Sequence, residues 1–108
     1  MPVVSLDHIK AKERLPGFVG GFIHTERVTI AHFKVRQGSV LPEHKHKEEQ
    51  VTIPIQGMFK LTINGETTVI QPGCIALIPS YAPHSGEALT NFEAIDVFSP
   101  VREDYKID

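Results

Sequence analysis

Residues 42–50 (PEHKHKEEQ) contain two histidines that stand two positions apart. In an extended strand, residues i and i+2 project from the same face, so His44 and His46 are expected to point in one direction. Gln50 follows four residues after His46, and His84 lies 40 residues after His44. Three imidazoles and one amide oxygen suffice to hold one divalent ion. A solvated charged turn is the alternative interpretation of the same histidines.

Short strands are the elements expected to position these residues. Eight glycines and eight prolines divide the sequence into short segments rich in Val, Ile, Thr and Phe. This pattern predicts strands in FVGGFIH, RVTIAHFKV, QVTIPIQG, MFKLTIN, ETTVIQP, CIALIP and NFEAIDVF. The N-terminal segment SLDHIKAKERL predicts one or two helical turns. Many short strands separated by frequent turns are typical of an all-β sandwich or barrel.

Two local signals refine the strand pattern. Asn64-Gly65 is a preferred two-residue hairpin turn, because both residues tolerate a positive φ. Pairing across this turn places Phe59, Leu61 and Ile63 on one face with Thr68 and Ile70. Pro54 lies inside a predicted strand but has no N–H to donate to a neighbour, which predicts an edge or a β-bulge there.

Length and composition limit the class of protein. The 108 residues suffice for one domain, and the apolar content of 41% predicts a folded chain. The net charge of −2 and the absence of like-charged blocks favour neither nucleic acid nor a membrane surface as a partner. No signal-peptide pattern precedes the domain, and the single Cys74 is expected to be a buried, inert thiol, so a cytoplasmic location is predicted. Open sheet edges favour a homodimer.

Two spaced motifs give the histidines a context. Gly38, His44, His46, Gln50 and Gly57 follow the spacing of the first cupin motif, Gly-x5-His-x-His-x3/4-Glu-x6-Gly, with Gln in place of Glu. Gly73, Pro79, Tyr81, His84 and Ala88 follow the second motif, Gly-x5-Pro-x-Gly-x2-His-x3-Asn, with Tyr81 in place of Gly and Ala88 in place of Asn. The chain therefore resembles the cupins over about residues 27–99. This resemblance implies a jelly-roll (double-stranded β-helix) barrel formed by a single domain, residues 1–108, with both terminal segments at the barrel edges and mouth.

The Glu-to-Gln departure has chemical consequences. Three neutral histidines and a neutral amide leave a bound ion its full positive charge, which favours Lewis acidity and the binding of anionic substrates. Such ligands suit one divalent Ni, Zn, Fe or Mn ion. The alternative is a three-histidine site with Gln50 outside the ligand shell.

The last predicted strand carries a second group of candidate residues. In AIDVFSPVRED, residues 94–104, Asp96 and Phe98 share one face. A carboxylate on an inward face is costly unless it meets a metal, a hydrogen bond or a substrate. Ser99-Pro100 ends the strand and Arg102 follows it. An ordinary last strand with a charged exit is the alternative interpretation.

This segment and the His-x-His…Gln set resemble the KdgF-type cupins of pectin degradation, whose last strand reads Asp-x-Phe-Ser-Pro-x-Arg. The resemblance implies that His44, His46, His84 and Gln50 hold the metal. It also implies that Asp96 is catalytic and that Phe98 and Arg102 bind substrate. That family linearises the 4,5-unsaturated monouronates left by pectin and alginate lyases. The expected products are open-chain 4-deoxy-keto sugar acids.

Three other functions remain as alternatives at this point. A metal-dependent dioxygenase or another small-molecule cupin enzyme uses the same fold, although oxygen-activating sites commonly include a carboxylate ligand. A non-catalytic sugar-binding cupin needs only the pocket. A cupin lyase for small sulfonium acids is the third alternative, and the missing acidic ligand weakens it.

Overall fold

The computed structural model describes residues 3–106 and contains ten strands and two single-turn 3-10 helices in that range. The order is η1 (Leu6–His8), β1 (Ala11–Leu15), β2 (Phe18–His24), β3 (Thr29–Val35), β4 (Val40–His44), β5 (Glu49–Gln56), β6 (Phe59–Ile63), β7 (Glu66–Ile70), β8 (Ala76–Ile78), β9 (His84–Ala88), β10 (Phe92–Ser99) and η2 (Glu103–Tyr105). No helix among these residues has the length and apolar character needed to cross a membrane.

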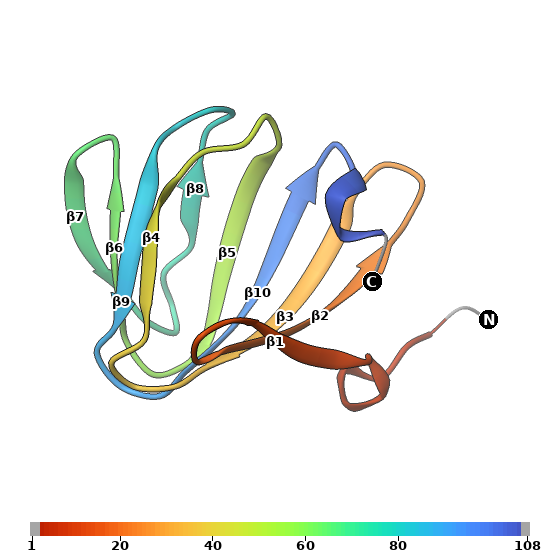
Figure 1. Cartoon of the computed structure of the whole chain (residues 1–108), viewed down its shortest axis with the longest axis horizontal. Helices are drawn as coiled ribbons and strands as arrows, with labels where there is room; N and C mark the ends of the chain where they lie inside the picture. The colour runs from red at the N-terminus through yellow and green to blue at the C-terminus, as the bar shows by residue number, and fades with distance from the viewer. Residues whose placement is uncertain (1–2, 107–108) are drawn as a thin grey trace.

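The strands form two antiparallel sheets that face each other (Figure 1). The larger sheet has the order β1-β2-β3-β10-β5-β8, and the smaller has the order β4-β9-β6-β7. Buried apolar side chains from both sheets meet between them, among them Phe18, Val35, Phe59, Leu61, Ile78 and Phe92. The result is the predicted all-β jelly-roll barrel with one core.

The β6–β7 hairpin confirms the register predicted from its turn. Asn64 and Gly65 adopt φ values of 49° and 81°, as a tight two-residue turn requires. Phe59 pairs with Ile70, and Leu61 pairs with Thr68. The apolar residues of β6 therefore face the core.

Pro54 lies beside an irregularity in the β5–β10 pairing. Ala94 pairs with Pro54 whereas Glu93 pairs with Gln56, so Ile55 is an extra residue on β5. The bulge follows because proline cannot complete the ladder. A bulge is one of the two features predicted at Pro54, and the strand itself is internal rather than an edge.

Several expectations from the sequence are corrected. The N-terminal segment forms one 3-10 turn and then strand β1, which pairs with β2, because β2 offers a free edge. Strands β4 and β9 were not predicted, since VLPEH and HSGEA lack an alternating apolar pattern. Cys74 is exposed instead of buried, because it lies in the turn before β8 and its N–H donates to the carbonyl of Gln71.

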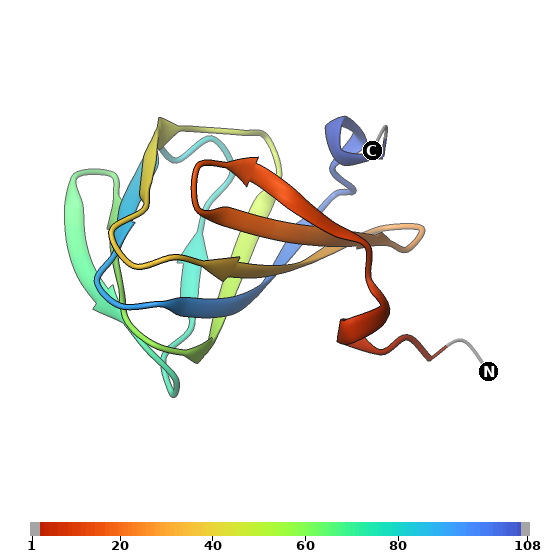
Figure 2. The same cartoon turned by 60° about the horizontal axis from the view of Figure 1, so that its bottom comes forward.

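The larger sheet extends past the smaller one through its N-terminal strands, and η1 and η2 both lie at that same end of the molecule (Figure 2). The outer face of the larger sheet exposes the aliphatic side chains of Val19, Ile53, Ile55 and Leu77. A second copy of the chain is one means of covering such a surface. The homodimer stays a prediction.

Candidate metal centre and pocket

Three histidines meet at one end of the smaller sheet, where His44 is exposed, His46 is half-buried and His84 is buried. His44 ends β4 and His84 begins β9, and the two residues pair directly in the sheet. His46 lies two residues beyond the end of β4, and its ring still converges with that of His44, as expected from the His-x-His spacing. The backbone N–H of Tyr81 donates to the carbonyl of His46 at 2.8 Å and fixes this segment. One potential ligand atom from each histidine lies within 4.8 Å of the others.

Backbone carbonyls determine which ring nitrogen of each histidine carries the proton. Each Nδ1 lies 2.9–3.0 Å from a carbonyl oxygen two residues away in the chain, that of Pro42, Glu48 or Ala82. A carbonyl only accepts, so each Nδ1 carries the proton and donates it. Each Nε2 therefore keeps its lone pair. This is the arrangement in which outer contacts orient histidine ligands toward a metal.

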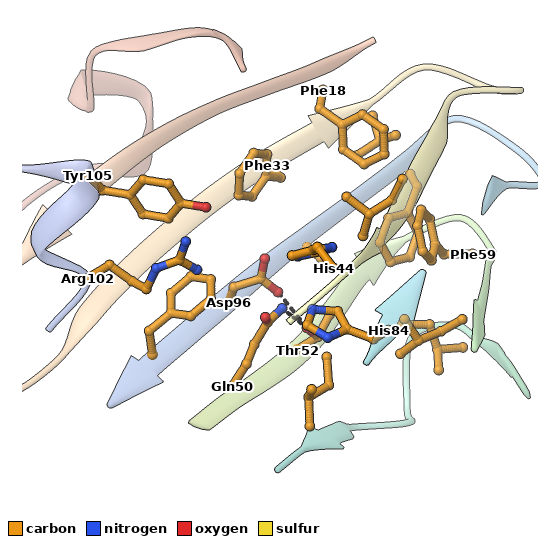
Figure 3. Close-up of a pocket in the computed structure, with 18 residues that line it drawn as sticks. Phe18, Phe33, His44, Gln50, Thr52, Phe59, His84, Asp96, Arg102 and Tyr105 are labelled. Carbon is orange, nitrogen blue, oxygen red and sulfur yellow. Dashed lines mark hydrogen bonds between the residues drawn. The ribbon is translucent and has the colours of Figure 1, made fainter. Parts of the chain in front are cut away.

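Gln50 is oriented by a chain of hydrogen bonds that begins at Asp96. The hydroxyl of Thr52 donates to Asp96 Oδ1 at 2.6 Å, and its oxygen then accepts from Gln50 Nε2 at 3.0 Å (Figure 3). The carbonyl oxygen of Gln50 must consequently face the histidines, where it lies 3.2 Å from His46 Nε2. Gln50 Oε1 and His46 Nε2, which both carry lone pairs, thus face each other.

A divalent cation fits this set of atoms. His84 Nε2 is buried and has no hydrogen-bond partner among the described residues. Burial, aided by the neighbouring positive groups, lowers the pKa of His84 to about 4, so the ring is neutral at neutral pH. Burial and the charge of Arg102 also lower the pKa of His46. The neutral ring of His84 therefore offers a buried lone pair to a cation.

Asp96 lies on β10 opposite Thr52 and lines the same cavity as His44 and His84. Burial raises the pKa of Asp96 to about 6, and the hydrogen bonds from Thr52 and Gln50 limit this rise. A carboxyl group with a pKa near neutrality can both accept and release a proton at neutral pH. The prediction that Asp96 faces inward is confirmed, whereas its catalytic role stays a prediction.

The cavity between the sheets has a volume of about 100 Å³. Its polar lining consists of His44, Gln50, Thr52, His84, Asp96, Arg102 and Tyr105. Phenylalanines from both sheets supply much of the remaining wall (Figure 3). The few polar groups converge in an apolar enclosure, which is the usual construction of a small-molecule site.

Arg102 lines this cavity but is not a free cation. Its Nε and Nη2 donate to the two carboxylate oxygens of Asp104 at 3.0 and 2.8 Å, and its Nε lies 3.5 Å from the buried carboxylate of Glu48. The guanidinium also lies 4.8 Å from the centroid of the Phe98 ring. The sequence left an ordinary charged exit from the last strand as the alternative to substrate binding. The structure shows the pairing and the cavity position together.

Three residues of the site were not predicted. Thr52 orients Gln50, Glu48 is buried beside His46 and Arg102, and Tyr105 lines the cavity from the C-terminal turn. The sequence did carry a signal for Thr52. Residues i and i+2 of a strand share a face, so this alternation places Thr52 beside Gln50 on the inward face of β5. Glu48 and Tyr105 depend on contacts across the fold, and their local sequence carries no such signal.

The fold and the histidine cluster define a class of protein. The cupin domain family matches residues 31–98, and the chain belongs to this family. The backbone explains one position in each of the two cupin motifs. A side chain at Gly57, which has a φ of 86°, would collide with the backbone carbonyl of Asn91. Tyr81 stands where the family has glycine and adopts a φ of 61°.

Within the cupins, the chain is similar to KdgF. The structure of KdgF from Halomonas sp. shares 28% sequence identity, covers 94% of each chain and gives a TM-score of 0.85. A RmlC-like cupin from Shewanella frigidimarina has 22% identity, 92% and 90% coverage and a TM-score of 0.86. Salicylate 1,2-dioxygenase from Pseudoaminobacter salicylatoxidans has 20% identity, covers 80% of this chain and 28% of its own, and gives a TM-score of 0.76. The last two similarities show the fold alone.

Replacing Gln50 by glutamate is expected to retain the metal but to lower turnover by about 10- to 100-fold. A carboxylate reduces the charge of a bound ion and has no N–H for Thr52, so the contact that orients residue 50 is lost. Elemental analysis and steady-state kinetics measure the two effects. Gln56→Glu, at the exposed end of the same strand, is the matched control. Unchanged turnover in Gln50→Glu would show that the amide has no role at the site.

Proposed function

We propose that this cupin is a metal-dependent enzyme that converts 4,5-unsaturated monouronates into linear 4-deoxy-keto sugar acids. One observation carries the proposal: two histidines of the cluster, His44 and His84, line the same cavity as Asp96 and Arg102. An electrophilic centre, a proton-transfer group and an anion-binding group are the components that this reaction needs. The similarity to KdgF and the matching residues of the last strand support the assignment.

The reaction is an isomerisation in two stages. Ring opening breaks the bond between C1 and the ring oxygen, while a proton leaves the C1 hydroxyl. The ring oxygen remains on C5 as an enolate, and ketonisation then adds a proton at C4 and converts this enolate into a ketone. His44, His46, His84 and Gln50 are the proposed ligands of a divalent metal, which when bound stabilises negative charge on substrate oxygen.

Asp96 is the proposed proton-transfer group. Its carboxylate accepts a hydrogen bond from Thr52 through Oδ1, so Thr52 holds the side chain in place. Its raised pKa allows it to take the proton of the C1 hydroxyl and to deliver one to C4. Because Asp96 accepts one proton and later donates one, the isomerisation proceeds with no net gain or loss of protons.

Arg102 and Phe98 are the proposed contacts to the sugar. Asp104 holds Nε and Nη2 of Arg102, and Nη1 takes part in neither of these bonds. The adjacent guanidinium edge is the proposed contact for the substrate carboxylate. Phe98 packs edge-on against His46, with ring centroids 5.7 Å apart, and supplies an apolar wall between the metal centre and Arg102.

Arg102→Ala is expected to lower kcat/KM for the unsaturated monouronate by roughly 10- to 150-fold, the value of one charge-assisted bond to a carboxylate. Arg102→Lys should recover only part of this loss, since an ammonium group has no planar fork. The loss appears mainly in KM if Arg102 only anchors the substrate. Arg27→Ala, at an exposed position, is the control. Wild-type kinetics in Arg102→Ala would make the pairing with Asp104 purely structural.

The direct test is turnover of the unsaturated monouronate produced by a pectin or alginate lyase, followed by the absorbance of its C4–C5 double bond. Accelerated decay of this absorbance without oxygen consumption supports the proposal. Oxygen consumption by an iron-loaded sample would instead indicate a dioxygenase. Binding of the sugar without any conversion would indicate a non-catalytic cupin.

A further inference from the structure

Tyr105 brings a phenol hydroxyl to the cavity from outside the barrel. It belongs to η2, the turn that follows the last strand, and it lines the cavity together with Asp96 and Arg102. Figure 3 shows its ring beside Arg102 with the hydroxyl directed into the space between Arg102 and Phe33. The proposed reaction mechanism above does not use this group.

Contacts on both faces hold the Tyr105 ring in place. Phe22 of β2 stacks on it with centroids 4.0 Å apart and an angle of 19° between the planes. The guanidinium carbon of Arg102 lies 4.1 Å from the same centroid. Two groups at this distance must occupy opposite faces of the ring. Phe98 adds an edge contact at 6.0 Å, so the direction of the hydroxyl is fixed before any ligand binds.

The chemistry of this position favours an anionic partner. Burial raises the pKa of Tyr105, so the phenol keeps its proton and acts as a hydrogen-bond donor at neutral pH. The neighbouring Arg102 is positively charged, and both of its bonds to Asp104 lie on one edge of the guanidinium. The phenol O–H, which lies next to a cation, is expected to bind a carboxylate acceptor more strongly than it binds a neutral hydroxyl acceptor. The reason is that a hydrogen bond to an ionised acceptor is charge-assisted.

We propose that Tyr105 is a further substrate-binding residue, whose phenol O–H donates to the carboxylate of the uronate that Arg102 also holds. This inference rests on the proposed function and defines its specificity. The two donors together distinguish uronates from neutral sugars. The stacked arrangement Phe22–Tyr105–Arg102–Phe98 makes strand β2 and the C-terminal turn part of the substrate site.

Tyr105→Phe removes the hydroxyl and leaves the stacking ring. The expected result is a fall in kcat/KM for the unsaturated monouronate of roughly 10- to 150-fold, found mainly in KM, with unchanged metal content. Tyr81→Phe is the matched control, because Tyr81 is 61% exposed and does not line the cavity. Tyr105→Ala should lose more than Tyr105→Phe, since Arg102 then also loses its stacking partner.

Calorimetric binding of galacturonate, a saturated uronate, gives a readout that does not depend on turnover. Tyr105→Phe should weaken this binding by a similar factor. Wild-type affinity and kinetics in Tyr105→Phe would overturn the inference, as would a loss confined to kcat or a wild-type protein that does not bind galacturonate. If the wild type binds galacturonate through Tyr105 but leaves the unsaturated monouronate unchanged, the binding inference stands and the proposed function fails.

Discussion

Asp96→Asn is expected to lower kcat for the unsaturated monouronate by about 10²–10⁴-fold, the usual contribution of a general acid or base. The amide has nearly the same shape as the carboxyl group, and its oxygen still accepts the hydrogen bond from Thr52. The orientation of Gln50 should therefore survive, and the metal content should remain unchanged. Only the ability to take up and release a proton at the cavity wall is lost.

Stopped assays at saturating substrate measure this effect, and elemental analysis and the thermal midpoint are measured on the same sample. Asp7→Asn, which alters an exposed carboxylate in η1, is the control and should behave as wild type. A lowered thermal midpoint with retained kcat would assign Asp96 a structural role as the hydrogen-bond acceptor of Thr52.

His84→Ala is expected to lose most of the bound metal, and turnover should then fall to the uncatalysed rate. His84 supplies the one buried side-chain atom without a hydrogen-bond partner among residues 3–106, and its ring lies 4.2 Å from that of His44 between centroids. Removing the imidazole of His84 takes one ligand from the proposed metal site and leaves a cavity in the core. The measurement is metal per chain by elemental analysis, with turnover assayed in the same preparation.

Because His84 is buried, a second variant separates metal loss from unfolding. His44 is exposed at the end of β4, so His44→Ala should keep the fold and still lose the metal. His8→Ala, at an exposed position in η1, is the control. Full metal occupancy in a folded His44→Ala or His84→Ala protein would remove that histidine from the proposed ligand set.

Short-range patterns account for the parts of this fold that the sequence predicts. The Asn64-Gly65 turn fixes its own hairpin, because two residues with positive φ determine the register of both strands. The spacing of the two cupin motifs likewise indicates that His44, His46 and His84 converge. These signals need only a few neighbouring residues or a known motif.

Long-range contacts account for the parts that the sequence does not predict. Strand β9 begins with His84 and has no apolar alternation, so it is a strand only because β4 and β6 flank it. The orientation of Gln50 depends on Asp96, which is 46 positions away in the chain. The stacking of Tyr105 on Phe22 joins the two ends of the domain. Such contacts exist only after the sheets have assembled.

Arg102 shows how the structure changes a prediction without removing it. The family resemblance implies that Arg102 binds substrate, and the structure holds its guanidinium between two aromatic rings and beside two carboxylates. A guanidinium held in this way loses little conformational freedom when it binds an anion. The pairing with Asp104 is thus compatible with the proposed role in orienting a substrate carboxylate.

The central claim is that one cavity combines a metal centre with a proton-transfer group to linearise an unsaturated uronate. The most direct measurement follows the absorbance of the C4–C5 double bond of lyase-generated monouronate with the metal-loaded protein, the chelated protein and loaded Asp96→Asn. We expect rapid decay of this absorbance, and an open-chain keto acid as product, with the loaded wild type only. Decay at the buffer rate in the presence of the loaded wild type would contradict the account.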